Sequence, residues 1–177
     1  RQPERKVPAV KSRGPSSTLK KVVVLLLDRT SEKGYLNPGT LGQTEAIDLL
    51  TLDGEHQAME LEQVKCVYFV REFNETFELE RKTFLSRPKL DGLWVRLRFK
   101  DDDTIEGIVS NNLLDLLDTG VQLTPPDLHG NVLRMFIPRS SLVEMKVLGV
   151  VGVARRSPRA TRGIAAVAEA QSKLFGE

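Results

Sequence analysis

The sequence offers few side chains that could carry out catalysis or ligate a metal. Its two histidines, His56 and His129, each lie beside a turn glycine, where an exposed surface histidine is the simpler interpretation. The single cysteine, Cys66, lies within an apolar run, as buried and unreactive cysteines do. The Cys-x-x-Cys and His-x-x-x-His spacings typical of zinc sites do not occur. We therefore expect no bound metal.

Two further groups of residues could bind a ligand. The carboxylates of residues 101–103 could hold a divalent cation, although short acidic side chains at a hairpin tip also cap their own backbone. Trp94, followed by Arg96 and Arg98, could stack on single-stranded nucleic acid, and the alternative is a core tryptophan at the start of a strand. No glycine-rich loop is followed by Lys-Ser/Thr, the pattern that cradles phosphates. The sequence thus predicts a protein that is not an enzyme and that uses no cofactor.

The composition is that of a folded globular protein. The chain has 177 residues, of which 40% are hydrophobic and 28% charged, enough for one medium domain or two small ones. No apolar run approaches the roughly 20 residues that a transmembrane helix needs. A single cysteine suits a reducing compartment. We expect a soluble, cytoplasmic protein that does not contact a membrane.

Charge is distributed unevenly along the chain. Residues 1–21 hold seven Lys/Arg and one Glu, and residues 154–177 hold five Lys/Arg and two Glu, so a chain of net charge +2 has a central body of −7. The two basic tails are either solvated arms or contacts for an anionic partner such as nucleic acid, a ribosome or an acidic protein. A tail could also fold back on the acidic body. The basic residues singled out are Lys20, Lys21, Arg155, Arg156, Arg159 and Arg162.

The central body contains the same pattern twice. Val22, Val24, Leu26 and Gly34 align with Val95, Leu97, Phe99 and Gly107 at an offset of 73. Further along, residues 61–70 align with residues 139–148 at an offset of 78. Insertions are tolerated best in loops, so we place the difference between the offsets in the middle of the unit. The pattern predicts a duplicated β unit.

Each unit reads as a short β meander. Alternating or continuous apolar residues separated by turn residues predict strands at 22–27, 32–36, 46–52, 57–61 and 64–70 in the first unit, and at 95–100, 104–109, 120–123, 133–137 and 142–148 in the second. We expect a basic tail over 1–20, units over 21–71 and 93–153, a linker over 72–92, and a basic linker with a short helix over 154–177.

Three of the strands are apolar on both faces. The runs 22–27, 66–70 and 147–153 contain almost no polar residue. A strand that is apolar on both faces must be covered on both, and one small unit can cover only one of them. We therefore expect the two units to pack together, and the pattern also favours a homo-oligomer.

Each unit resembles small Sm-like and SH3-like barrels, on the strand, turn, Gly-x-hydrophobic strand and closing Val-x-x-hydrophobic-Val strand described above. The resemblance implies a mainly β fold of two tandem small Sm-like/SH3-like β-barrel repeats packed together, between a flexible basic N-terminal tail and a short C-terminal helix. The RNA pocket of the Sm family needs an Asp and an Asn shortly after the glycine, and Asn111 and Asn112 lie at roughly that place. The pocket also needs Arg-Gly or Lys-Gly before the last strand, where this chain has residues 136–139, Phe-Ile-Pro-Arg. The resemblance therefore does not extend to a uridine pocket.

The body is also similar to an uncharacterised family of bacterial proteins with a domain of unknown function. The residues that carry this resemblance are the runs 34–38, 64–71, 84–95, 124–127 and 147–152. The family implies no activity, although some relatives accompany PilZ domains, which bind cyclic-di-GMP. The PilZ pattern is matched only in part, by Arg1 and Arg5 and by Asp115 and Gly120, with Leu117 where the pattern has serine. A degenerate PilZ-like nucleotide-binding protein is thus a remote alternative.

The C-terminal segment carries a candidate docking peptide. Ser157-Pro158 is a typical helix start, and Ile164, Val167, Gln171 and Leu174 follow at helical spacing. Residues Gln171, Leu174 and Phe175 are similar to the Gln-x-x-Leu-Phe peptides that bacterial replication and repair proteins insert into the sliding clamp. The alternative is a short amphipathic helix that lies on the body or frays.

Two hypotheses of function remain open at this point. The first is a non-catalytic adaptor, in which paired β units present a surface and the tails recruit a protein partner. The second is a nucleic-acid-associated protein that uses the basic tails and the sliding-clamp-like peptide. Binding that weakens steeply with salt favours the second hypothesis, because phosphate contacts release counterions.

Overall fold

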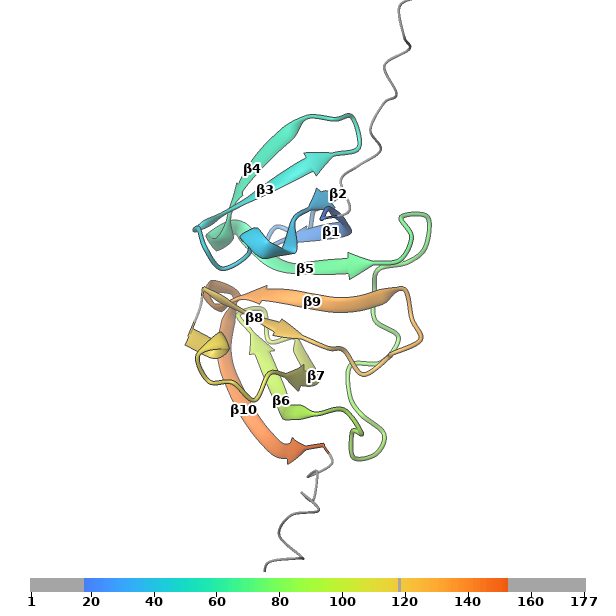
Figure 1. The fold of residues 1–177 in the computed structure, drawn as a ribbon, viewed down its shortest axis with the longest axis vertical. Coiled ribbons are helices and arrows are strands. Elements are labelled where there is room, and N and C mark those ends of the chain that lie inside the picture. The colour runs from blue at the N-terminus through green and yellow to red at the C-terminus, as the bar shows by residue number, and fades with distance from the viewer. Residues whose placement is uncertain (1–17, 118, 153–177) are drawn as a thin grey trace, which may run out of the picture.

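Ten β-strands and four 3-10 helices build the described part of the chain, and all strand pairs are antiparallel. The computed structural model describes residues 18–117 and 119–152 (Figure 1). The strands are β1 Lys20–Leu26, β2 Ser31–Leu36, β3 Ala46–Thr51, β4 His56–Glu60, β5 Val64–Val70, β6 Gly92–Phe99, β7 Thr104–Val109, β8 Gly120–Leu123, β9 Val132–Pro138 and β10 Leu142–Val151. The 3-10 helices are η1 Pro38–Thr40, η2 Leu61–Gln63, η3 Asp115–Leu117 and η4 Arg139–Ser141. The predicted mainly β fold is confirmed.

The strands form two open sheets. One has seven strands in the order β4-β3-β2-β1-β5-β9-β8, and the other has three in the order β10-β6-β7. A single bridge between Ile108 and Thr124 brings β7 beside β8. The predicted closed barrels are wrong. Closing the first unit would need β4 to pair with β5, but the second edge of β5 is hydrogen-bonded to β9 instead.

The two halves of the body have the same order of elements. In each half a four-strand meander is followed by a 3-10 turn and a fifth strand that pairs with the first: β1–β4, η2 and β5, then β6–β9, η4 and β10. The registers also agree: Val22–Gly34 and Val95–Gly107 pair across the first hairpin, and Val24–Val67 and Leu97–Met145 pair between first and fifth strands. These pairs preserve the offsets of 73 and 78 that align the sequence.

Glycine is required at the same place in both halves because the next layer of chain approaches closely. A Cβ added at Gly34 would overlap the carbonyl oxygen of Leu50 on β3. A Cβ added at Gly107 would overlap the side chain of Leu123 on β8. A larger residue at either glycine would push the strand away from its neighbour.

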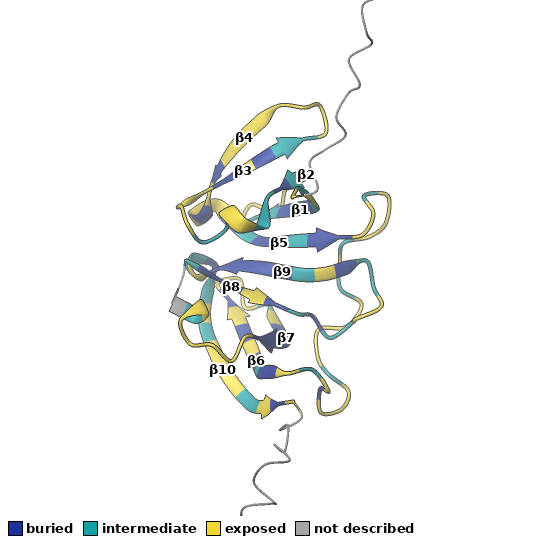
Figure 2. Cartoon of the chain, viewed as in Figure 1, coloured by how far each residue is buried: buried dark blue, intermediate teal, exposed yellow. Residues whose placement is uncertain are grey.

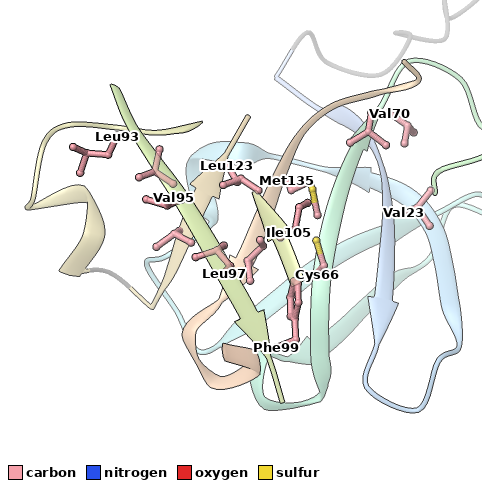
Figure 3. Packing of buried hydrophobic residues seen from close by; sticks show 14 residues of the cluster. Val23, Cys66, Val70, Leu93, Val95, Leu97, Phe99, Ile105, Leu123 and Met135 are labelled. Carbon is pink, nitrogen blue, oxygen red and sulfur yellow. The ribbon is translucent and has the colours of Figure 1, made fainter. Parts of the chain in front are cut away.

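The halves share their hydrophobic packing through β1 and β5. The first core is the cluster Val22, Val24, Leu36, Ile47, Leu49, Met59, Leu61, Val64, Val67, Phe69 and Phe136. The second core is the cluster Val23, Cys66, Val70, Leu93, Val95, Leu97, Phe99, Ile105, Val109, Val121, Leu123, Val132, Met135 and Ile137 (Figure 3). Alternate residues of β1 and β5 thus face different cores, and Figure 2 shows much of β5 as buried. Residues 22–24 and 66–70 are thus covered on both faces within the chain, as expected, but the end of the run 22–27 is not, because Leu27 is 43% exposed.

Two further expectations concern a membrane-spanning helix and the two ends of the chain. Among the described residues, no helix is long and apolar enough to cross a membrane. The predicted C-terminal helix in 154–177 lies outside the described residues, as does the basic tail before residue 18.

Candidate functional site

The outer strand β10 exposes a row of apolar side chains. Val143, Met145, Val147 and Val150 are 50%, 39%, 56% and 60% exposed. One edge of β10 pairs with β6, and no other described strand pairs with its second edge (Figure 2). Within the chain, the apolar run 147–153 is not covered on both faces over most of its described part, because β10 is the last strand of its sheet, and cover by another chain stays a prediction.

Three of the exposed apolar residues of β10, Met145, Val147 and Val150, lie on the core side of the sheet. Met145 lies opposite Leu97 of β6, and Val147 lies opposite Val95, and both of these β6 residues are completely buried. Residues directly opposite each other in an antiparallel pair share one face. The apolar surface of the second core thus continues onto β10 and there meets solvent.

The strand β4 is another end strand with one unpaired edge. It pairs only with β3 among the described strands, at the other end of the seven-stranded sheet. His56, Gln57, Ala58 and Glu60 are exposed, and Met59 alone points into the first core. Figure 1 shows β4 and β10 at opposite ends of the molecule.

A groove of about 660 Å³ lies where β5 meets the turn between β6 and β7. Nζ of Lys65 is 2.6 Å from Oδ2 of Asp101 and 3.3 Å from Oδ2 of Asp103. Nζ of Lys82 is 2.8 Å from Oδ1 of Asp103. The ring centroid of Phe99 lies 4.8 Å from Nζ of Lys65. The acidic run 101–103 is thus a hairpin tip neutralised by two lysines, and this arrangement opposes a cation site.

The ion pairs in this groove shift the pKa values of their members. Burial acts to lower the pKa of Lys65, but its hydrogen bonds to the two aspartates outweigh burial and raise the pKa. The hydrogen bond from Lys65 lowers the pKa of Asp101. Burial acts to raise the pKa of Asp103, and the hydrogen bonds from Lys82 and Lys65 outweigh burial, so that this pKa is lowered too. All three groups are therefore held in their charged forms.

Glu106 is a buried carboxylate that fixes Trp94. Its side chain accepts hydrogen bonds from the backbone N–H of Phe84 at 2.9 Å, from Nε1 of Trp94 at 3.4 Å and from Nη2 of Arg96 at 3.2 Å. The ring of Phe84 packs edge-on against Trp94, with 6.2 Å between the ring centroids. Trp94 is partly buried and belongs to neither hydrophobic core, because it lies on the face of β6 opposite Val95 and Leu97; the core interpretation is therefore wrong, and the stacking interpretation stays a prediction. The sequence did not indicate Glu106, because its partners come from two other segments.

The groups that could react or ligate are not brought together. Among the described residues, no three His, Cys, Asp or Glu side chains are placed to hold a metal ion. Nδ1 of His56 is 3.0 Å from Oδ1 of Asp48, and both side chains are exposed. His129 lines a separate groove beside Asp127 and Asn131. Cys66 is completely buried, and burial raises the pKa of its thiol, which disfavours the reactive thiolate.

Of the residues predicted to bind a partner, Lys20 and Lys21 lie within the described part of the chain. Both belong to the start of β1 rather than to a tail. Nζ of Lys21 is 2.9 Å from Oε2 of Glu72 and 5.9 Å from the ring centroid of Phe73, so its charge is already engaged. The other predicted residues lie outside the described part: Arg155, Arg156, Arg159, Arg162, Gln171, Leu174 and Phe175.

The PilZ-like residues are also only partly described. Arg1 and Arg5 lie outside the described residues. Asp115 begins η3, and Gly120 begins β8, where a Cβ would overlap Phe136. Packing against Phe136 is thus sufficient to explain this glycine, and nucleotide binding is not needed to explain it.

These features define an all-antiparallel β protein with two open sheets and a shared interior, in which β4 and β10 are end strands far from each other. The chain belongs to DUF6982, a family of unknown function, whose model matches residues 18–149. No match was found among curated proteins or among solved structures. The predicted membership of an uncharacterised family is confirmed, and the association with PilZ domains stays a prediction.

Proposed function

We propose that this chain is a non-catalytic adaptor in which β10 is a partner-binding strand. The observation that carries the proposal is the row of apolar side chains exposed on β10. Burying one half-exposed Val or Met side chain contributes roughly 1 kcal/mol. A protein that adds a strand to this edge would gain that energy together with backbone hydrogen bonds, as in other cases of β-strand addition.

The scaffold of the adaptor would be two tandem units with a strand order similar to Sm-like and SH3-like domains, each left open rather than closed into a barrel. The common order of elements and the common registers support this interpretation. A β-bulge also falls at equivalent places, because Lys65 of β5 and Val143 of β10 are the extra residues between the first two pairs of each ladder. Bulges are specific features that related units retain.

The proposal of a non-catalytic role is supported by the contacts of the ionisable side chains. The carboxylates of Asp101 and Asp103 are bound by lysines, and that of Glu106 by three donors. The buried thiol of Cys66 is held in its unreactive form. Catalytic sites instead gather titratable groups in a cleft with pKa values that favour proton transfer.

Affinity capture with the immobilised full chain tests the adaptor proposal. We compare the original chain with Val147→Lys on β10 and with Leu85→Lys, which places the same charge at a residue that is 80% exposed and outside both open edges. The proposal predicts proteins that bind the original chain and Leu85→Lys but bind Val147→Lys at least tenfold more weakly, as measured with the purified binder. Equal capture by all three chains would contradict it.

A second candidate, association with nucleic acid, is favoured by the concentration of positive charge at the two ends. The body carries a net charge of −7, so phosphate contacts would fall to the tails 1–21 and 154–177. Measuring the affinity for a generic DNA duplex at several salt concentrations tests this candidate. It predicts an affinity that falls steeply as salt rises. A measurable affinity with no salt dependence, or no binding at low salt, would reject it.

A further inference from the structure

We propose that the partner of β10 is the strand β4 of a second copy of this chain, so that copies associate head to tail. The inference rests on the proposed function, because it names the occupant of the same strand edge. It begins from a contact that already exists inside the molecule, the antiparallel pairing of β5 with β9.

The pairing of β5 with β9 joins two defined positions in the meander. β5 is the fifth strand of the first half, and β9 is the fourth strand of the second half. The other fifth strand is β10, and the other fourth strand is β4. Both are end strands of their sheets, and they lie at opposite ends of the molecule (Figure 1), whereas the other two end strands, β7 and β8, lie beside each other and are linked by the Ile108–Thr124 bridge. Repeating the internal contact therefore leads from β10 of one copy to β4 of the next.

The alignment of the halves also predicts the register of the contact. Within the chain, Val67 pairs with Phe136, and Phe69 pairs with Arg134. The offset of 78 moves β5 onto β10 and β4 onto β9. The equivalent pairs between copies are Met145 with Ala58 and Val147 with His56.

The side chains of the two strands would be compatible in this register. On the face of the first core, the apolar pair Val67–Phe136 corresponds to the pair Met145–Ala58, which is also apolar. On the other face, the apolar pair Tyr68–Met135 corresponds to Lys146–Gln57, in which both partners are polar and exposed. The first face would be mixed, because Val147 would lie opposite the polar His56 as Phe69 lies opposite Arg134 within the chain, and the second face would be polar. The contact between copies would bury less apolar surface than the internal contact, so we expect it to be reversible.

The backbone of β10 is suited to this role. The first bulge of β10 lies at the position where β5 also has one, and β5 pairs with β9 from Val67, beyond its bulge. The same stretch of β10 starts at Met145, where its side chains are exposed. A contact between different edges is heterologous, and such contacts generate closed rings or open filaments. Each copy within such an assembly would use both of its open edges.

Analytical ultracentrifugation of the full chain tests this inference. The variants are Val147→Lys, which blocks β10, Ala58→Lys, which blocks β4, and Leu85→Lys as the matched control. Both substituted edge residues are exposed, so the fold tolerates the change. We expect the original chain and the control to reach an average mass of at least two chains as concentration rises, and each edge variant to stay at one chain.

Mixing the two edge variants gives the decisive result. Each variant keeps one intact edge, so an equimolar mixture should form a complex of one chain of each kind and nothing larger. Assembly that is lost with Val147→Lys but unaffected by Ala58→Lys would indicate a symmetric β10–β10 contact and overturn the inference. A chain that remains monomeric at all concentrations would overturn it as well. In that case the adaptor proposal still stands if capture of another protein depends on Val147, and it falls if capture does not.

Discussion

Phe136 of β9 lies opposite Val67 of β5, and its side chain is buried in the first core although its strand belongs to the second half. The neighbouring residues of β9, Met135 and Ile137, point into the second core. Each half thus completes its interior with a part of the other. The body is expected to behave as one cooperative unit rather than as two independent domains.

Replacing Phe136 with alanine should destabilise both halves together. Removing a buried phenylalanine costs about 3–5 kcal/mol, because apolar contacts are lost and a cavity is left. Urea unfolding should show one transition at a lower midpoint, with fluorescence of Trp94 in the second half and circular dichroism changing together. The control Leu133→Ala, at a residue 46% exposed on the same strand, should cost less than about 1 kcal/mol. Two separate transitions would contradict the shared interior.

The contacts of Lys65 should make stability depend on pH in acid. The pKa values of Asp101 and Asp103 are lowered from 3.8 in the folded protein, so their contribution is present above that value and is lost as pH falls through the folded pKa values. The free energy of unfolding should fall between pH 6 and pH 3. In Lys65→Met this fall should be smaller than in the original chain by about 1 kcal/mol, a value that allows for solvent screening. Lys89→Met, at an exposed lysine, serves as the control for net charge. An unchanged pH dependence in Lys65→Met would show that these ion pairs contribute nothing.

Loss of the Glu106 carboxylate should loosen the segment around Phe84. In Glu106→Ala, the donors on Trp94 and Phe84 lose their acceptor, at a cost of about 2–3 kcal/mol. Because Trp94 is the only tryptophan, its emission maximum reports the change directly. Glu106→Gln keeps one acceptor oxygen and should cost less, and Glu75→Ala, at an exposed residue, should leave the emission unchanged. Identical emission from the original chain and Glu106→Ala would refute this role.

Cys66 should be inert toward thiol reagents while the protein is folded. The side chain is completely buried, and burial raises the pKa of the thiol, so the thiolate is scarce at pH 8. Ellman's reagent should react at a rate set by unfolding, and the rate should rise with added urea. Rapid stoichiometric reaction in the absence of denaturant would place Cys66 at a solvent-accessible site instead.

The strands could be predicted from the sequence because their signals are local. Alternation of apolar and charged residues, as in 95–100, and turn residues between the runs place each strand within a few residues of its observed bounds. The aligned glycines Gly34 and Gly107 mark equivalent close approaches of the chain, and the offsets they define agree with the observed registers.

The pairing between the halves could not be predicted, because strands pair through backbone hydrogen bonds that every residue type can make. Nothing in the side chains of β5 and β9 specifies that these two strands are partners, and closed barrels were expected for that reason. The apolar pattern of β10 indicated that the strand needs cover, but it could not indicate that the cover is absent within the described part of one chain. Burial of Glu106 depends on donors from distant segments and was likewise out of reach.

Amide hydrogen exchange over a range of protein concentrations tests the central claim most directly, namely that the open edge of β10 is where this chain binds. Both edges of β5 are hydrogen-bonded, so its amides should be protected at every concentration. The amides of residues 145–148 that face the open edge of β10 should exchange quickly in dilute solution and become protected, together with those of β4, as concentration rises. Exchange of β10 and β4 that does not change with concentration would contradict the account.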